Sequence, residues 1–294
     1  MFRLTPILCF VPILAAADLK VDHATIAGRN LTELENMFGA VGIPTEFGGK
    51  HSNGLTEMAL ASFPDGSYLE LIAPQGGADV RTHYWGKAML EQSGPVAWAV
   101  ASQDIPADAR RLVEARIPVL TQSSGRKRPD GVDLKWETAT VGPEPQGSFF
   151  PFLIHDETPR ELRVFPKGHP TLPQISGVRF VVVAVRDLNS AVAKYRAAFG
   201  LGAPESGSDA SLGASLKWFK DTPMILAASA ASGAWLSRRL DQFGESPCVF
   251  VLGVKSLAGF SVDAHSVWFS HNLAWLDQAK LGGMRIAVTT LLTP

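Results

Sequence analysis

The apolar and polar positions of this chain repeat in three related segments. Each segment starts with a short apolar run that suits a buried strand, reaches an Asn or Asp, and continues with apolar residues at helical spacing. The segments open at His23, Ala97 and Phe180 and reach their helix starts at Asn30, Asp104 and Asp187. Because Asn and Asp cap helix N-termini, the pattern predicts a strand followed by a helix three times.

The first segment continues into further strands, so residues 20–73 are predicted to form one β-α-β-β-β module. Pro64-Asp65-Gly66 is a strong turn signal between its last two strands. The predicted strands cover residues 20–28, 43–50, 55–63 and 67–73, and the predicted helix covers residues 31–41. Residues 76–93 are expected to form a linker with some helix.

A second module of the same kind is predicted after this linker. Its strands are expected at residues 95–102, 117–123, 132–140 and 148–155, and its helix at residues 106–116. Val132, Leu134, Trp136 and Thr138 alternate along one strand, which would put them on one face of the sheet. Arg126, Lys127 and Arg128 precede the turn before this strand, and such a cluster is usually a solvated hairpin tip.

The rest of the chain is predicted to be a degenerate copy of the module. Its strands are expected at residues 177–186, 214–219, 223–229, 248–254 and 284–291, and its helices at residues 188–198, 234–243 and 270–280. The predicted organisation is therefore a paired unit over residues 18–157, with modules at 18–75 and 94–157, a linker at 158–175 and a degenerate domain at 176–294. Residues 246–291 would be a fourth, poorly preserved module.

Composition and the N-terminal residues narrow the possible partners. The 294 residues have a net charge of −1, which disfavours nucleic acid and anionic membranes as partners. Arg3, an apolar run to Leu14 and three alanines resemble a signal peptide over residues 1–17, so we expect an exported, periplasmic or secreted protein without a membrane segment after cleavage. Cys248 would then be the one remaining thiol, and its apolar surroundings predict a buried, inert side chain.

Several motifs of residues 20–155 resemble the vicinal oxygen chelate superfamily, and more closely a glyoxalase-like domain. They are Asp22-His23, Gly48-Gly49-Lys50-His51, Tyr68-Leu69-Glu70-Leu71-Ile72, Arg128-Pro129-Asp130-Gly131 with Trp136, and Pro151-Phe152-Leu153-Ile154. The resemblance implies an α+β fold in which tandem β-α-β-β-β modules form a curved, cup-like mixed sheet, as in glyoxalase and dihydroxybiphenyl dioxygenase. Side chains that point into such a cup hold a divalent metal ion.

The resemblance also implies where metal ligands would lie. His23 and Glu70 occupy the two ligand positions of the first module, whereas Ala97 and Phe152 occupy those of the second. A third ligand could come from His51 or His155. A divalent ion held by only one imidazole and one carboxylate is bound weakly, because water fills the rest of its shell. No other cofactor is predicted, and the identity of the metal stays open.

His23 and Glu70 also have interpretations that need no metal. A carboxylate beside an imidazole orients its tautomer, so the pair could act as a general base. The same pair could equally provide a hydrogen-bonding floor for a ligand. The predicted substrate-binding residues are His51, Trp98, Arg128, Trp136 and Phe152, with Arg128 facing a ligand carboxylate and the aromatic residues forming an apolar wall.

Three functions follow from these expectations. The first is an enzyme of the lyase, isomerase or dioxygenase type that acts on a small organic molecule placed over His23 and Glu70. The absent ligands and the export signal argue against a glutathione-dependent glyoxalase. The second is a non-catalytic protein that sequesters a small molecule in the cup, and the third is a structural module whose cup is filled by side chains.

Overall fold

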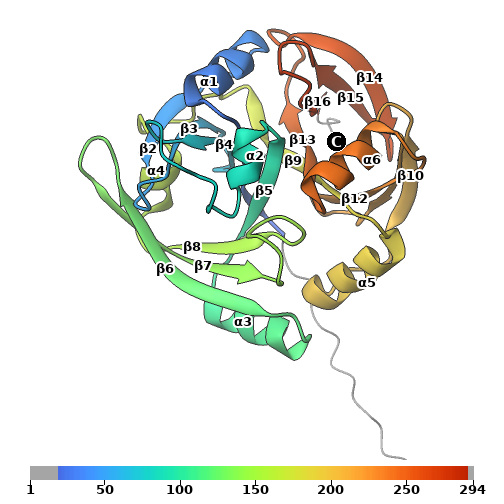
Figure 1. Cartoon of the computed structure of the whole chain (residues 1–294), viewed down its shortest axis with the longest axis horizontal. Helices are drawn as coiled ribbons and strands as arrows, with labels where there is room; N and C mark the ends of the chain where they lie inside the picture. Colours follow the sequence, from blue (N-terminus) through green and yellow to red (C-terminus); the bar gives the residue numbers. More distant parts are fainter. Residues whose placement is uncertain (1–18, 291–294) are drawn as a thin grey trace, which may run out of the picture.

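The computed structural model describes residues 19–290, so the predicted signal peptide lies outside the described residues. Two eight-stranded mixed sheets curl side by side (Figure 1). The first sheet has the order β2-β3-β4-β1-β5-β8-β7-β6 and the second the order β10-β11-β12-β9-β13-β16-β15-β14. The two orders are equivalent, so the second half of the chain repeats the strand arrangement of the first half.

The first sheet is built from the two predicted modules. Its strands are β1 (Val21–Ala27), β2 (Glu46–Lys50), β3 (Thr56–Ser62), β4 (Tyr68–Pro74), β5 (Gly94–Ala101), β6 (Val119–Lys127), β7 (Asp133–Val141) and β8 (Phe152–Asp156). Its helices are α1 (Leu31–Ala40), α2 (Gly86–Leu90) and α3 (Ile105–Glu114), and α4 (Arg160–Val164) follows. The central strand β1 pairs parallel with β4 and antiparallel with β5, which joins the modules into one sheet.

The second sheet contains more strands than the sequence pattern predicts. Its strands are β9 (Ile175–Ala184), β10 (Glu205–Asp209), β11 (Ala214–Trp218), β12 (Met224–Ser229), β13 (Ser246–Val254), β14 (Val262–Trp268), β15 (His271–Leu276) and β16 (Ile286–Thr290), and its helices are α5 (Leu188–Phe199) and α6 (Trp235–Phe243). The helix predicted over residues 270–280 is wrong, because most of that range is β15. Leu273 and Trp275 face one buried cluster and Ala274 and Leu276 the other, so the strand shows no alternation of apolar and polar residues.

The three predicted helix starts are confirmed by their caps. The side chains of Asn30, Asp104 and Asp187 accept hydrogen bonds from the backbone N–H groups three residues further on, at 2.8–3.0 Å. Each cap satisfies one of the N–H groups that a helix start leaves without an intrahelical partner. In the fourth repeat no helix lies between β13 and β14 in the described part of the chain.

The main hydrophobic core lies between the sheets and their helices. One buried cluster joins Phe38 and Trp98 of the first half to Val183 and Phe250 of the second half. Among residues 19–290, no helix is long and apolar enough to cross a membrane.

The concave faces of the two sheets differ. A second buried cluster fills the hollow of the second sheet, where Phe180 packs edge-on against Trp218 and His271. The repeat places Phe180 at the position that His23 occupies in the first sheet, so a large apolar side chain replaces a polar one there. The first sheet instead retains an open cup.

Candidate functional site

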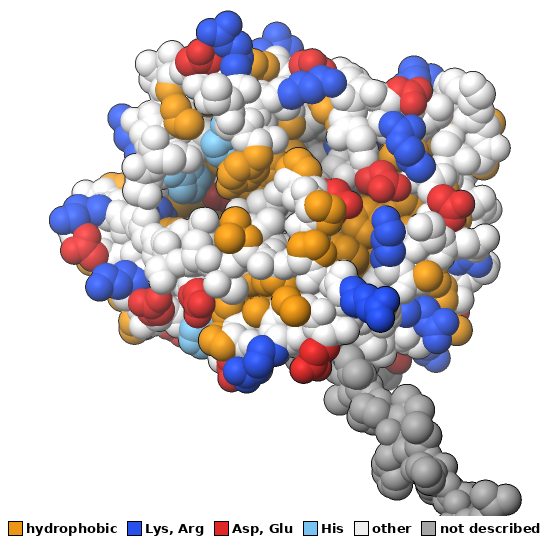
Figure 2. Space-filling view, turned by 60° about the horizontal axis from the view of Figure 1, so that its bottom comes forward, with side chains coloured by type: hydrophobic (Ala, Val, Ile, Leu, Met, Phe, Trp, Pro, Cys, Tyr) orange, Lys and Arg blue, Asp and Glu red, His pale blue; other side chains and the backbone are white. Residues whose placement is uncertain are grey.

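The cup of the first sheet encloses a cavity of about 340 Å³, a size that suits a small organic ligand. Its lining combines titratable and aromatic side chains. His23, His51, Glu70 and Arg126 lie among the polar residues, and Tyr84, Trp85, Trp136 and Phe152 among the aromatic ones. Figure 2 shows His side chains beside hydrophobic side chains around a hollow in one face of the molecule.

Strand register brings the polar residues of the floor together. β1 and β4 run parallel with Thr25 opposite Glu70 and His23 opposite Tyr68. The Thr25 hydroxyl therefore donates a hydrogen bond to Glu70 Oε2 at 3.1 Å, and the rings of His23 and Tyr68 stack with their centroids 4.8 Å apart. The Nε2 atom of His23 lies 3.9 Å from Glu70 Oε2.

His51 approaches Glu70 from the other side. Its Nε2 atom lies 3.4 Å from Glu70 Oε1, while its Nδ1 atom lies 2.8 Å from the Thr56 hydroxyl. Burial alone would raise the pKa of Glu70, but the His51 contact, the charge of His23 and the Thr25 hydroxyl outweigh it and lower that pKa to about 2. Glu70 is therefore an ionised, buried carboxylate between two imidazoles at neutral pH.

Asp22 orients His23 from below the cup. The Nδ1 atom of His23 lies 2.6 Å from Asp22 Oδ1, and an ionised carboxylate can only accept, so Nδ1 carries the proton. The pKa of Asp22 lies well below its usual value because the attraction of Arg163 and His23 outweighs the effect of burial. The Nε2 atom of His23 is then the nitrogen free to exchange a proton with a ligand in the cavity.

Two arginines of the connector hold Asp22 in place. Arg163 Nη2 donates to Asp22 Oδ2 at 2.9 Å, and Arg160 donates to the same oxygen. Arg163 Nη1 also donates to the Tyr68 hydroxyl at 2.7 Å. The segment expected to be a plain linker thus supplies the charges that stabilise the acid behind His23.

Arg126 is a further cation of the cup. It was expected at a solvated hairpin tip, but its side chain is only 6% exposed and its Nη1 atom donates to the Gly48 carbonyl at 2.7 Å, which links the edge strands β2 and β6. Within residues 19–290, no carboxylate lies at ion-pair distance from it. Burial lowers the pKa of Arg126, which is the expected effect for a cation without a paired acid.

The predicted site residues separate into two groups. His23, His51, Glu70, Trp136 and Phe152 all line the cavity, and the ring of Phe152 contacts that of His23 edge-on at 5.3 Å. The other three predicted residues lie outside the cavity.

Trp98, Arg128 and His155 do not line the cup, which corrects the expected placement of these side chains. Trp98 is fully buried in the main core, because β5 is apolar on both faces and the pattern does not tell them apart. Arg128 donates to the carbonyls of Leu162 and Pro166 outside the cavity. His155 lies outside the cup because it alternates with the residues of β8 that line the cavity, and its Nδ1 atom lies 3.0 Å from the Ser102 carbonyl oxygen.

The polar floor does not match the ligand set of a divalent metal site. Among residues 19–290, no group of three or more His, Cys, Asp or Glu side chains has an arrangement suited to a metal ion. The His23 nitrogen that faces Asp22 is occupied, and Phe152 and Ala97 provide no donor from the second module. The described residues thus supply no complete ligand set, and metal binding at His23 and Glu70 stays a prediction that the structure does not support.

Sequence reasoning missed the roles of Asp22, Arg126, Arg160 and Arg163. The alternation of Gln122, Ser124 and Arg126 along β6 is the one local signal that could have placed Arg126 in the cup. The ion pairs of Asp22 join residues about 140 positions apart, so no local spacing indicates them.

Solved structures share this architecture over nearly the whole chain. A hypothetical protein from Staphylococcus aureus is 14% identical, with 92% of this chain and 99% of that chain covered and a TM-score of 0.62. A triple mutant of 4-hydroxymandelate synthase from Streptomyces coelicolor is 11% identical, with 93% of each chain covered and a TM-score of 0.62. At such identities the likeness shows the fold alone. No curated protein matches the chain by sequence.

Four repeats paired into two curled sheets define the vicinal oxygen chelate fold. Residues 21–179 match the family model of the glyoxalase-like domain, which is more than half of the chain. The chain belongs to this glyoxalase-like domain family, as the motifs around His23 and Glu70 predicted.

Proposed function

We propose that the cup of the first sheet binds a small organic carboxylate and that His23 moves a proton on this ligand. The observation that carries the proposal is the Asp22–His23 pair, whose free nitrogen faces a ligand-sized cavity beside the ionised Glu70. An imidazole oriented by a buried acid is a common general base.

The reaction class is proton transfer next to a carbonyl group. His23 Nε2 would take a proton from a carbon beside the carbonyl. The electron pair of the broken C–H bond would form a C=C bond while the π pair of the C=O bond moves onto the carbonyl oxygen, which gives an enolate. Return of a proton to the same carbon restores the ligand with hydrogen exchange, and its delivery to a neighbouring atom completes an isomerisation; neither needs an oxidant or reductant. Glu70 would stabilise the protonated imidazole, since its carboxylate lies 3.9 Å from Nε2.

Arg126 supports a ligand with a carboxylate group. It is a buried cation in the cavity lining without a paired acid in the described residues, so an anionic ligand would supply the missing partner. Trp136 and Phe152 provide apolar surface for the rest of the ligand. From the signal peptide predicted at residues 1–17 we also propose that the protein is exported.

Deuterium exchange tests the proposal. The protein is incubated in D2O with a panel of small 2-oxo carboxylic acids, aliphatic and aromatic, and deuterium incorporation is followed by proton NMR while affinity is measured by titration calorimetry. We expect at least one acid to bind and to exchange above the uncatalysed rate. His23→Asn should lower that rate roughly 100-fold or more while binding changes only a few-fold.

Two arginine variants form a matched pair in the same assay. Arg126→Gln should weaken binding about tenfold, because it removes a charge-assisted contact. Arg128→Gln, which lies outside the cup, should leave affinity unchanged, and thermal unfolding checks that both variants are folded. Binding without exchange would refute catalysis and favour the sequestering protein. Absence of binding by every acid would refute both.

A further inference from the structure

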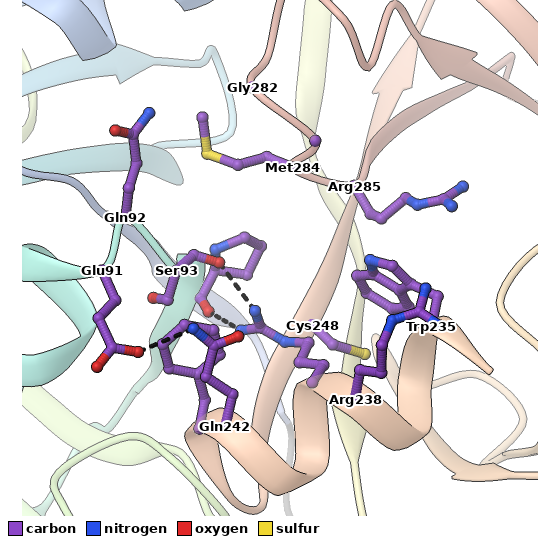
Figure 3. Close-up of a pocket in the computed structure, with 14 residues that line it drawn as sticks. Glu91, Gln92, Ser93, Trp235, Arg238, Gln242, Cys248, Gly282, Met284 and Arg285 are labelled. Carbon is purple, nitrogen blue, oxygen red and sulfur yellow. Dashed lines mark hydrogen bonds between the residues drawn. The ribbon is translucent and has the colours of Figure 1, made fainter. Parts of the chain in front are cut away.

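A second cavity, of about 220 Å³, lies where the two halves of the chain meet. Residues 91–95, which lead into β5, form one side, and α6, Cys248 of β13 and residues 282–285 before β16 form the other. Figure 3 shows Gln92 and Ser93 on one side of this cavity and Trp235 and Arg285 on the other. It shares no lining residue with the cup.

Arginines dominate the charge of this cavity. Arg238, Arg239 and Arg285 all line it, against a single carboxylate, that of Glu91. The Glu91 Oε2 atom accepts a hydrogen bond from the Gln242 amide at 2.8 Å, and within residues 19–290 none of the three arginines forms an ion pair. The lining therefore carries an excess of two positive charges.

Arg239 is the most buried of the three cations, with 7% of its surface exposed. It donates to the carbonyls of Ser93, at 2.8 Å, and Pro95 in the first half and to that of Pro247, at 2.7 Å, in the second half. Its Nε atom has no hydrogen-bond partner in the described structure. Burial lowers the pKa of Arg239 to about 10, and the neighbouring Cys248 thiol does not neutralise it, because burial raises the pKa of that thiol to about 12.

Two more polar atoms of the same lining are buried without partners. Within the described residues, these atoms are Ser93 Oγ and Arg285 Nε. The Arg285 guanidinium lies over the Trp235 ring at 5.2 Å from its centroid, which fixes its position at the cavity. Unpartnered buried donors and a buried cation without a paired acid are costly, and all three donors belong to side chains that line this one cavity.

We infer that the cavity between the halves binds a small oxyanion, such as a phosphate or a carboxylate, through Ser93, Arg239 and Arg285. An oxyanion supplies both the negative charge and the several acceptor oxygens that these donors lack. Because Arg239 already joins both halves through backbone carbonyls, the bound anion stabilises their junction. This site is independent of the function proposed for the cup.

Titration with inorganic phosphate tests the inference. Calorimetry is run against sodium chloride at matched ionic strength, together with thermal unfolding at rising phosphate concentration. We expect saturable binding of one phosphate per chain and a melting temperature that increases with phosphate but not with chloride. Parallel titrations with sulfate and acetate distinguish a tetrahedral oxyanion from a carboxylate as the preferred ligand.

Four variants locate the site. Arg285→Gln and Ser93→Ala should each weaken phosphate binding by about tenfold or more, whereas Arg110→Gln, at an exposed arginine of α3, should not. Arg126→Gln removes the cation of the cup and should leave phosphate binding unchanged, so this experiment can fail or succeed separately from the deuterium exchange. Equal responses to phosphate, sulfate, acetate and chloride would overturn the inference. Saturable binding that survives both Arg285→Gln and Ser93→Ala would overturn it too.

Discussion

Arg163 and Asp22 lie 141 residues apart in the chain and form a two-point ion pair, with Nη1 at 3.1 Å from Oδ1 and Nη2 at 2.9 Å from Oδ2. Asp22 is fully buried and Arg163 is 4% exposed. The pair holds α4 against the start of β1, next to His23. The connector between the two halves is therefore part of the support of the site.

Removal of one partner of this ion pair should destabilise the protein strongly. Arg163→Met leaves the Asp22 carboxylate buried with Arg160 as its remaining arginine partner and also breaks the pair with Asp156. Breaking a buried pair in this way costs about 3–5 kcal/mol. Urea unfolding followed by circular dichroism measures the loss. Arg81→Gln breaks the exposed pair with Asp79 and should leave stability unchanged. A loss for Arg163→Met no larger than that of the surface control would contradict the structural role of the pair.

A matched substitution separates loss of the ion pair from loss of packing. Asp22→Asn keeps the size of the side chain but removes its charge, so Arg163 loses this ion pair and keeps the one with Asp156. In the double variant Asp22→Asn with Arg163→Met, the two losses should not add, because the residues act on the same interaction. Additive losses would show that the two side chains contribute independently.

The free energy of unfolding should depend on pH in a way that reports the low pKa of Glu70. Its folded pKa is about 2 against an ordinary value of 4.5, so the folded state favours the ionised form. The stabilisation that the ionised Glu70 carboxylate gives the folded state is fully present above pH 4.5 and is lost as the pH falls toward 2. Glu70→Gln should therefore show a flatter decline of the unfolding free energy over this range than the parent protein, measured by urea unfolding at several pH values. Parallel curves would contradict the ionised state of Glu70.

The sequence predicted the modules well because their signals are local. An apolar run followed by a capping Asn or Asp marked the starts of β1, β5 and β9 and of their helices, and the caps at Asn30, Asp104 and Asp187 form as expected. The resemblance to the superfamily, rather than this pattern, placed His23 and Glu70 in one cup. Local signals fail where a strand is buried on both faces, as at Trp98 and along β15, and where an ion pair spans the chain, as at Arg163.

The filled hollow of the second sheet should make Phe180 more important for stability than Phe152. Phe180 is packed on all sides by the second buried cluster, whereas Phe152 borders the open cavity of the cup. Phe180→Ala should cost about 3–5 kcal/mol, as for other buried aromatic residues, and Phe152→Ala should cost clearly less. Urea unfolding of both variants tests this order, and the reverse order would mean that the second hollow is not tightly packed.

Phe152 also explains why the cup is a poor match for a metal site, and substitution there should improve it. The resemblance to the superfamily places a ligand at this position, and the Phe152 ring lies 5.3 Å from that of His23. Phe152→His would add a third nitrogen or oxygen donor to His23 and Glu70.

We expect Phe152→His to bind Co²⁺ at least about tenfold more tightly than the parent protein, since each further ligand replaces a water molecule in the shell of the ion. Titration followed by the visible absorption of Co²⁺ measures the affinity, and Phe152→Leu is the control that changes shape without adding a donor. The parent protein, purified without chelator and dialysed, should contain less than one equivalent of metal by elemental analysis. A full equivalent that is lost in His23→Ala and in Glu70→Ala would show instead that the two residues suffice to hold the ion.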